Sequence, residues 1–300
     1  MTNITCLVDN SPAPSGATSL AVEHGLSFWI EHASVRILFD TGRSPLFLAN
    51  AGALGVDPAA ADHVVISHGH YDHANGLTSL FAPFFRDARA VEGPRDTRFL
   101  RPHTPLWLGT GFFVPKWSIE PGNNRFIEAS WSEGDAKAAN LDVRYTGQGT
   151  SGPYVCEIEP GISLVGGFFR RYPQESIAAR MQLEENGVYR QDDFADEHAL
   201  VLDMGESLAL VIGCAHPGIM NMIETIGELF DKPLSAVFGG SHLVEADAAR
   251  IDETIDFLND SRIALAALGH CTGAAALSRL KESCPAWKPL HAGARFVLDD

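Results

Sequence analysis

Four residues of metal-binding type stand within six positions of one another, directly after an apolar run. They are His68, His70, Asp72 and His73 in the stretch VVISHGHYDHANGL at positions 64–77. A short loop after a strand lets such side chains converge, the first two histidines on one metal ion and the Asp-His pair on a second. A solvated polar loop is the alternative, but this spacing is far more specific than a lone histidine pair. The stretch therefore predicts a centre for two metal ions.

Three more histidines follow apolar strands in the last third of the chain. His216, His242 and His270 each stand at the end of a predicted strand and before a turn or helix. Open α/β sheets collect their ligand-binding groups at such strand ends. Cys214, two positions before His216, can face the same side while strand geometry persists, and a thiolate beside an imidazole suits zinc. The alternative for Cys214 is a small buried hydrophobic residue.

The roles of these late residues differ. We leave His242 open among a metal ligand, an acid-base group and a hydrogen-bond donor to substrate. His270 is the better candidate for a last metal ligand, and Cys271 should point away if His270 points in. The other histidines lack such contexts, and we expect surface or structural roles for His24, His32, His63, His103, His198 and His291.

A pair of arginines stands among aromatic residues in the middle of the chain. Arg170 and Arg171, in the stretch FFRRYP, are candidates to clamp a phosphate or carboxylate of a substrate. A solvated pair on the surface is the alternative.

The elements that must position these residues alternate between strands and helices. A closely spaced group of strands with one helix opens the chain, and regular alternation returns after position 198. Between them, residues 81–194 contain many Pro, Gly and Asn interruptions and are expected to be an irregular insertion that shapes a substrate pocket. The predicted strands are 26–31, 35–42, 63–70, 234–240, 263–270 and a hairpin over 198–216, and the predicted helices are 44–56, 219–230 and 247–260.

Composition excludes several classes of function. The chain has 300 residues, of which 45% are hydrophobic and 20% charged, as in an ordinary globular protein. Its 38 acidic and 22 basic residues give a net charge of −16, which repels a phosphate backbone, so nucleic acid is not an expected partner and a nuclease is disfavoured.

The first residues and the cysteines indicate the compartment. The N-terminal stretch shows no basic segment followed by an apolar one, and no apolar run approaches the roughly 18 residues that span a bilayer. We therefore expect a cytoplasmic protein without a membrane partner. Five scattered cysteines, an odd number, argue against a disulfide framework.

Several stretches together resemble a known family. His68, His70, Asp72 and His73 resemble the signature of the metallo-β-lactamase fold, and Asp40 in ILFDTG resembles that fold's upstream strand aspartate. The stretches LVDNSPAPSGATSLAVEHGLSFWIE, ISHGHYDHANGL, GCAHPGIMNMI, FGGSHL and GHCTG, about half the chain with their neighbours, are similar to one subfamily of it. This subfamily is named after the archaeal 7,8-dihydropterin-6-methyl-4-(β-D-ribofuranosyl)aminobenzene 5′-phosphate synthase.

The resemblance implies a fold and a site. It implies an αββα sandwich in a single domain with the metal site on one edge, and it places Cys214 and His270 near the positions of a bridging ligand and a last histidine. Asp40 could orient a ligand histidine or stabilise the loop. The chain departs from the subfamily where Gly167 and Phe169 replace a glutamate and a proline, and where Glu92-Gly93-Pro94 replaces a His-Pro.

These observations predict an enzyme with two divalent transition-metal ions, zinc before iron or manganese. Two such ions lower the pKa of a bridging water toward neutrality and polarise a carbonyl or phosphoryl oxygen. We expect action on a small anionic metabolite, either hydrolysis by metal-bound hydroxide or pterin-linked condensation, with Asp72 and His242 in catalytic roles. A sensor that holds a small ligand without turnover is the alternative. An antibiotic-degrading lactamase is not expected, because no export signal is recognised, and the oligomeric state is left open.

Overall fold

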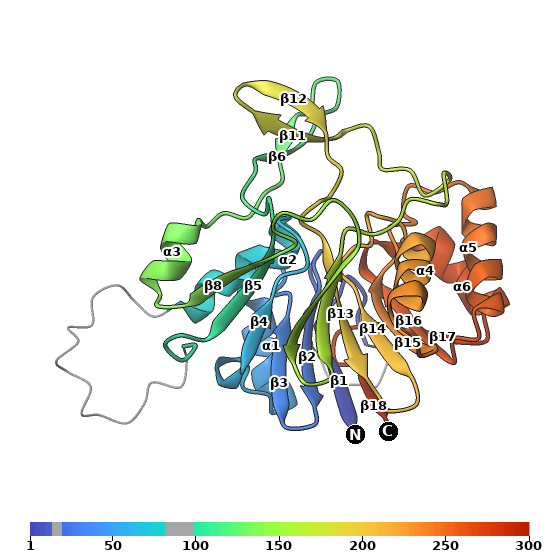
Figure 1. Cartoon of the computed structure of the whole chain (residues 1–300), viewed down its shortest axis with the longest axis horizontal. Helices are drawn as coiled ribbons and strands as arrows, with labels where there is room; N and C mark the ends of the chain where they lie inside the picture. Colours follow the sequence, from blue (N-terminus) through green and yellow to red (C-terminus); the bar gives the residue numbers. More distant parts are fainter. Residues whose placement is uncertain (14–19, 82–98, 300) are drawn as a thin grey trace.

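Two seven-stranded sheets lie face to face in the part of the chain that the computed structural model describes, residues 1–13, 20–81 and 99–299. Helices cover the outer surface of each sheet, so the layers follow the order helix, sheet, sheet, helix (Figure 1). The αββα sandwich predicted from the sequence is confirmed.

The first sheet contains the strands that precede the His-rich stretch. β1, β2 and β3 are antiparallel neighbours, whereas β3, β4, β5 and β8 run parallel to one another. In spatial order the strands are β18 (Arg295–Leu298), β1 (Thr2–Val8), β2 (Ser27–His32), β3 (Val35–Phe39), β4 (His63–Val65), β5 (Pro105–Gly109) and β8 (Asp142–Thr146).

The second sheet contains the strands that precede the late histidines. β14, β15, β16 and β17 run parallel, and β13, β10 and β9 extend the sheet antiparallel. In spatial order the strands are β17 (Trp287–Pro289), β16 (Leu265–Gly269), β15 (Leu234–Gly240), β14 (Leu208–Val211), β13 (His198–Asp203), β10 (Ile162–Gly166) and β9 (Tyr154–Glu159).

The helices divide between the two outer surfaces. α1 (Leu46–Leu54) and α3 (Glu133–Ala138) pack on the first sheet, and α4 (Ile219–Leu229), α5 (Ala248–Asp260) and α6 (Ala274–Ser283) pack on the second. α3 begins with a capping box in which Ser132 and Asp135 exchange side-chain to backbone hydrogen bonds. The remaining helical turns are α2 (Tyr71–Ala74), η1 (Pro58–Ala60), η2 (Asn75–Leu80) and η3 (His270–Thr272).

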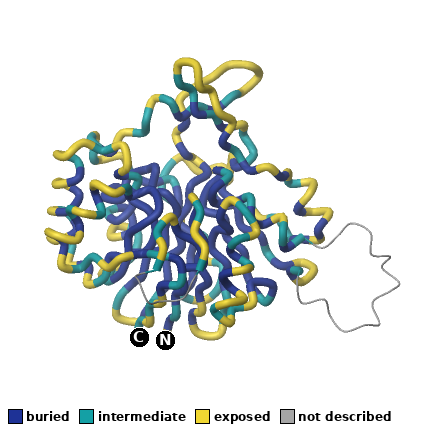
Figure 2. Tube along the Cα trace, turned by 180° about the vertical axis from the view of Figure 1, so that it is seen from behind, coloured by how far each residue is buried: buried dark blue, intermediate teal, exposed yellow. Residues whose placement is uncertain are grey.

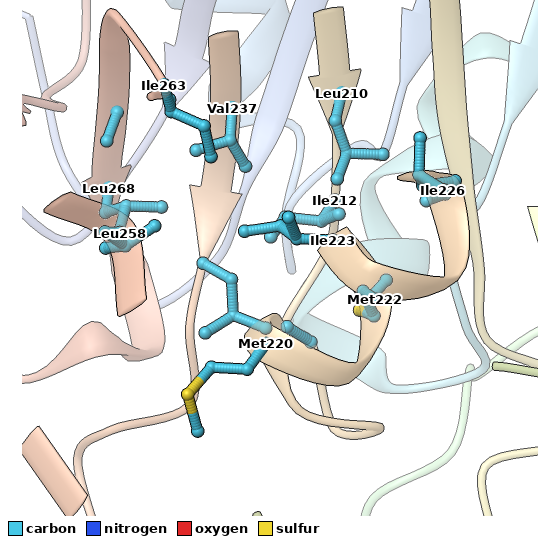
Figure 3. Packing of buried hydrophobic residues seen from close by; sticks show 14 of the residues in the cluster. Leu210, Ile212, Met220, Met222, Ile223, Ile226, Val237, Leu258, Ile263 and Leu268 are labelled. Carbon is cyan, nitrogen blue, oxygen red and sulfur yellow. The ribbon is translucent and has the colours of Figure 1, made fainter. Parts of the chain in front are cut away.

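Three apolar clusters hold the layers together. The cluster between the sheets includes Phe28 from β2 and Phe238 from β15, both fully buried. Figure 3 shows the cluster between the second sheet and its helices, where Ile223 and Ile226 of α4 face Leu210 of β14. Strands with a core on both faces have continuous apolar runs, and β15 and β16 have that composition. Figure 2 shows the buried strands at the centre and the exposed helix surfaces around them.

The expectation of an irregular insertion over residues 81–194 is wrong for part of that range. β5, β8, β9 and β10 belong to the two large sheets, and a separate four-stranded sheet is formed by β7 (Arg125–Phe126), β6 (Lys116–Ser118), β11 (Met181–Glu185) and β12 (Val188–Gln191). Strands of two to six residues between Gly, Pro and Asn turns offer too few alternating positions for a periodicity to show. The predicted departure at Glu92-Gly93-Pro94 lies outside the described residues.

The small sheet, which we call the cap, projects above the sandwich (Figure 1). Its two halves come from segments that are more than fifty positions apart. β6 and β7 follow β5 in the chain, and β11 and β12 follow β10. Among the described residues, none of the helices combines the length and the apolar character needed to cross a bilayer.

Close backbone packing fixes the turn that follows the His-rich loop. A Cβ atom at Gly76 would lie 2.0 Å from the carbonyl oxygen of Thr41 and 2.8 Å from that of Ser44, whereas a Cβ at Gly52 of α1 would meet nothing within 4 Å. We expect Gly76→Ala to lower the free energy of unfolding by about 2 kcal/mol, because backbone must move. Gly52→Ala should raise it by about 0.5–1 kcal/mol. Denaturant unfolding measures both, and equal effects of the two variants would contradict this packing.

Candidate metal centre

The predicted site residues follow the carboxyl ends of neighbouring parallel strands from both large sheets. Asp40 follows β3 and the His-rich loop follows β4, while Cys214, His242 and His270 follow β14, β15 and β16. Asp40, His242 and His270 have φ values of 56°, 45° and 50°, in the left-handed region that non-glycine residues rarely adopt. Such strain of about 1–3 kcal/mol per residue collects at functional sites, where the surrounding structure enforces it.

One group of donors consists of three histidines. His68, His70 and His216 each bring a ring nitrogen to within 4.8 Å of the other two. Their Nε2 atoms are buried and have no hydrogen-bond partner among the described residues. Burial holds the pKa of His68 and His216 well below the usual value and lowers that of His70 to about 3. Three neutral imidazoles with unpaired lone pairs are therefore directed at one point.

A second group of donors lies directly beside the first. Cys214 Sγ is 3.2 Å from His73 Nε2 and 3.4 Å from His270 Nε2. Asp72 Oδ2 completes the ring, 3.5 Å from His270 Nε2 and 3.9 Å from His73 Nε2. Each side chain of this group is at least nine-tenths buried.

These spacings fit a tetrahedral metal ion. With zinc bonds of about 2.0–2.3 Å, ligand atoms at the corners of a tetrahedron lie roughly 3.3–3.8 Å apart. Four of the six separations among the donor atoms of the second group, from 3.2 to 3.9 Å, agree with that range to within about 0.1 Å. The donor set of thiolate, imidazole and carboxylate is one that binds zinc or iron in preference to magnesium or calcium. The residues present therefore fit two divalent ions.

Asp40 orients two of the histidines. Its Oδ2 lies 2.6 Å from His73 Nδ1 and accepts a hydrogen bond of 2.8 Å from Ser67 Oγ, which is in turn 3.0 Å from His68 Nδ1. The backbone N–H of Ser67 donates to Asp40 Oδ1 at 2.7 Å. Although burial acts to lower it, the carboxylates of Asp40 and Asp72 raise the pKa of His73 to about 9. These hydrogen bonds at Nδ1 of His73 and His68 direct the Nε2 atom of each ring toward its donor group.

Asn10 performs the same task for two other rings. Its Oδ1 lies 3.0 Å from His270 Nδ1, and its Nδ2 lies 3.2 Å from His24 Nδ1. The opposite nitrogen of His24, Nε2, lies 3.0 Å from Asp72 Oδ2. Asp9 accepts the backbone N–H of His270 at 2.8 Å, and burial raises the pKa of this carboxyl to about 6.

Buried charged groups fix the loops that carry the donor residues. Lys116 Nζ is 3.2 Å from Asp196 Oδ2 and donates to the carbonyl of Phe112 at 2.9 Å, and Asp196 accepts the N–H of Gly69 at 2.8 Å. On the other sheet, Glu197 accepts the backbone N–H groups of Ala215 and His216 at 2.8 and 3.0 Å. Each carboxylate therefore fixes one of the turns that carry the donors.

A cavity of about 280 Å³ opens above the two donor groups. His242 lines it and packs against His216 with 4.3 Å between ring centroids, and burial lowers the pKa of His242 to about 4. On another side of His216, the ring of Phe194 stacks at 3.8 Å with an interplanar angle of 16°. Two cap residues, Arg125 and Met181, and their chain neighbours Ile127 and Arg180 also line this cavity.

The structure brings most of the predicted site residues together, with corrections of detail. Cys214 and His216 do not aim at one point as predicted, because the left-handed Ala215 (φ 58°) turns the chain between them and sends them to different groups. Cys271 does not point away, since its Sγ lies 3.4 Å from the carbonyl oxygen of Cys214 and belongs to one donor cluster with His270. The strand alternation on which that prediction depends ends at Gly269.

His24 and the two arginines also differ from the predictions. The sequence predicts a surface or structural role for His24, yet this residue contacts Asp72 and stacks on His270 with 5.1 Å between ring centroids. Arg171 is exposed and pairs with Glu228, with 3.0 Å between Nη2 and Oε2. Arg170 donates to the carbonyl of Asp193 at 2.7 Å. Neither arginine lines the cavity above the donors.

Other histidines have the structural roles expected of them. His63 lies 3.2 Å from Glu159 and accepts a hydrogen bond from Trp107 at 3.1 Å, and buried His198 contacts Thr146 at 2.9 Å. Asn10 and His24 lie in the stretch LVDNSPAPSGATSLAVEHG, which contributes to the family resemblance. The stretch has no motif of metal-binding residues, so the resemblance is the sequence feature that could have indicated these two residues.

Comparisons with known proteins agree with this geometry. A family model described as the metallo-beta-lactamase superfamily matches residues 20–123. The chain is 29% identical over 288 residues to the 7,8-dihydropterin-6-methyl-4-(beta-D-ribofuranosyl)-aminobenzene-5'-phosphate synthase of Methanocaldococcus jannaschii, covering 90% of this chain and 88% of that protein.

Solved structures show the same architecture. Tm1679, a metal-dependent hydrolase of the beta-lactamase superfamily, superposes with a TM-score of 0.81 and 28% identity over 100% of both chains. A diphosphatase from the PhnP family, with a TM-score of 0.53 and 12% identity, covers 100% of this chain and 98% of its own and shares the fold alone. Divalent metal ions are the cofactors that these similarities and the buried donor groups imply. The chain therefore has the metallo-β-lactamase fold, and over residues 20–123 its sequence matches the model of that superfamily.

Proposed function

We propose that the protein is a dinuclear zinc enzyme that hydrolyses an ester or phosphoester bond in a small aromatic anion. The observation that carries this proposal is the pair of adjoining donor groups at the floor of one cavity. A structural zinc site is closed by four protein ligands, whereas a catalytic site keeps a position open. The three-histidine group has that open character, because it offers three donors and faces the cavity through His70 and His216.

The proposal assigns the donors to two ions. His68, His70 and His216 hold the first, and Asp72, His73, Cys214 and His270 hold the second. Bound ions would lower the pKa of a water and polarise an oxygen of the substrate. Asp40 and Asn10 keep the ligand rings in one tautomer and one orientation, so little reorganisation is needed during the reaction.

The remaining cavity residues would act on the substrate. His242 lines the cavity without belonging to either donor group, so we propose that its ring exchanges a hydrogen bond or a proton with the substrate. Stacking of Phe194 on His216 excludes water from one face of that ring. The cavity volume of about 280 Å³ is just below the roughly 300–1,000 Å³ typical of ligand sites, so the cavity accepts one small molecule.

A pterin-linked condensation is the second candidate, and the archaeal relative favours it. The name of that relative describes a synthase whose product contains a dihydropterin and an aminobenzene ribofuranosyl phosphate. Either reaction places an aromatic, anionic molecule beside the metal ions. Incubation of zinc-loaded protein with carboxylic and phosphoric esters, and separately with an arylamine and a pterin that carries a leaving group, distinguishes the two reactions. Ligand binding without turnover in both assays would identify a sensor instead.

Removal of His70 tests the first group of donors. We expect His70→Ala to lower the metal content substantially while circular dichroism stays unchanged, because a three-histidine site loses a third of its ligands. The matched control is His103→Ala, since His103 is exposed and far from the donors in sequence. Elemental analysis after purification measures the content. An unchanged metal content in His70→Ala would exclude this group as a metal site.

The carboxylate of Asp72 tests the link between metal and turnover. Asp72→Asn keeps the shape of the side chain and removes its charge, so activity on any substrate found should fall by orders of magnitude. Asp252→Asn, on the exposed face of α5, is the control and should leave activity unchanged. Full turnover by Asp72→Asn would show that the carboxylate has only a structural role.

Cys214 tests the second group through its chemical reactivity. A ligand thiolate should be protected from alkylation in zinc-loaded protein and should react after chelation under native conditions. Cys284, an equally buried thiol at the end of α6, serves as the internal control and should stay inert in both states. Mass spectrometry assigns the modified residue. If Cys214 stays inert in folded, chelated protein and Cys214→Ala retains full metal content, the thiol is only a packed core residue.

A further inference from the structure

Two arginines, one in the cap and one directly beside it, line the cavity above the donor groups. They are Arg125 of β7 and Arg180, which directly precedes β11. The protein carries a net charge of −16, so its overall field repels an approaching anion. A cation in the wall of the cavity, apart from the metal donors, would offset this repulsion locally for an anionic substrate.

Arg180 is already occupied by protein groups. Its Nε and Nη2 lie 2.8 and 2.6 Å from Glu245 Oε1, and its Nη1 donates to Ser118 Oγ at 3.0 Å. Glu120 lies a further 3.6 Å from its Nε. Because the guanidinium is neutralised by two carboxylates, Arg180 ties the cap to the loop of His242 and offers little charge to a ligand.

Arg125 has no such partners. Within the described residues, its side chain makes no ion pair and no hydrogen bond, although the residue lines the cavity and is exposed to solvent. Tyr71 lines the same cavity, and its hydroxyl likewise has no hydrogen-bond partner in the described part of the chain. Burial and Asp72 raise the pKa of Tyr71, and the nearby charges of Arg43 and Arg125 oppose that effect.

We propose that Arg125, together with the hydroxyl of Tyr71, binds the anionic group of the substrate at the outer end of the cavity. The proposal rests on the proposed function, since it assumes that the reacting bond lies over the buried donors. A carboxylate or phosphate that accepts hydrogen bonds from a guanidinium and a phenol at that end holds the aromatic body of the molecule against the walls. Arg125 therefore selects anionic over neutral aromatic ligands.

The arginines predicted from the sequence do not offer this position. Arg171 is paired with Glu228 of α4, and Arg170 is engaged with the carbonyl of Asp193. Neither contributes to the wall of the metal cavity.

A binding experiment on zinc-loaded protein tests the proposal without any need for turnover. Two fluorescent probes, pterin-6-carboxylate and unsubstituted pterin, differ by the anionic group alone. We expect the wild-type protein to bind pterin-6-carboxylate more tightly than pterin. Arg125→Gln should lower the affinity for pterin-6-carboxylate by about tenfold or more and change the affinity for pterin by less than about twofold. Tyr71→Phe should show the same selectivity with a smaller effect, because it removes a neutral donor.

Arg190→Gln is the matched control. Arg190 lies on β12 of the same cap, is exposed, and pairs with Glu185, so this variant removes the same charge away from the cavity. It should bind both probes as the wild type does. The preference for the carboxylate should also fall with added salt in the wild type and lose most of that salt dependence in Arg125→Gln.

The outcomes separate this inference from the proposed function. Three results would each overturn the role of Arg125. They are an equal loss of affinity for both probes in Arg125→Gln, an unchanged preference for the carboxylate probe in that variant, and the absence of any preference in the wild type. Failure of all turnover assays with intact probe selectivity would instead overturn the catalytic proposal and leave the anion site standing. Where turnover is found, Arg125→Gln should raise KM for an anionic substrate with little change in kcat, since the contact is remote from the reacting bond.

Discussion

The hydrogen bond between Asp40 and His73 is the contact on which the candidate centre most depends. Both side chains are fully buried, and the bond joins the end of β3 to the loop that follows β4. The same carboxylate reaches His68 through Ser67, so one buried charge sets the direction of a ring in each donor group. A carboxylate without water around it is costly unless it is fully hydrogen-bonded, and here the loop supplies the bonds. Burial of Asp40 is therefore favourable only when the loop has the orientation that supplies these hydrogen bonds.

The second sheet meets this loop with its own strand ends. Cys214 and His270 follow β14 and β16, yet the sulfur and the ring lie within 3.4 Å of each other and beside His73 of the first sheet. The two sheets are held face to face by the fully buried cluster that includes Phe28 and Phe238. The apolar core thus sets the spacing of donors that, like His73 and Cys214, stand 141 positions apart in the sequence.

Elements with a strong local sequence pattern could be predicted from the sequence. Features that depend on how separate elements pack against each other could not. The His-rich loop, the late strands with a terminal histidine and the long helices were predictable because each has an apolar period or a motif inside a short window. The cap and the edge strands were not, since strands of two to six residues leave almost no period. Ala215 reversed the expected direction of Cys214, and a left-handed residue of that type has no signature in a single sequence. The sequence does not indicate the roles of His24 and Arg125, because these roles depend on segments that are far apart in the chain and pack together in the fold.

The separation of the cap from the two large sheets has a consequence for how such a protein can diversify. The metal donors depend on the strand ends and on the sandwich core. The cap strands contribute Arg125 and Met181 to the cavity wall and, among the described residues, form a sheet separate from the two large ones. Substitutions at the cap positions that line the cavity can therefore change its outer wall, whereas Lys116 of β6 remains tied through Asp196 to the turn at Gly69. At Arg125 and Met181, the wall of the cavity can therefore vary while the donor set stays the same.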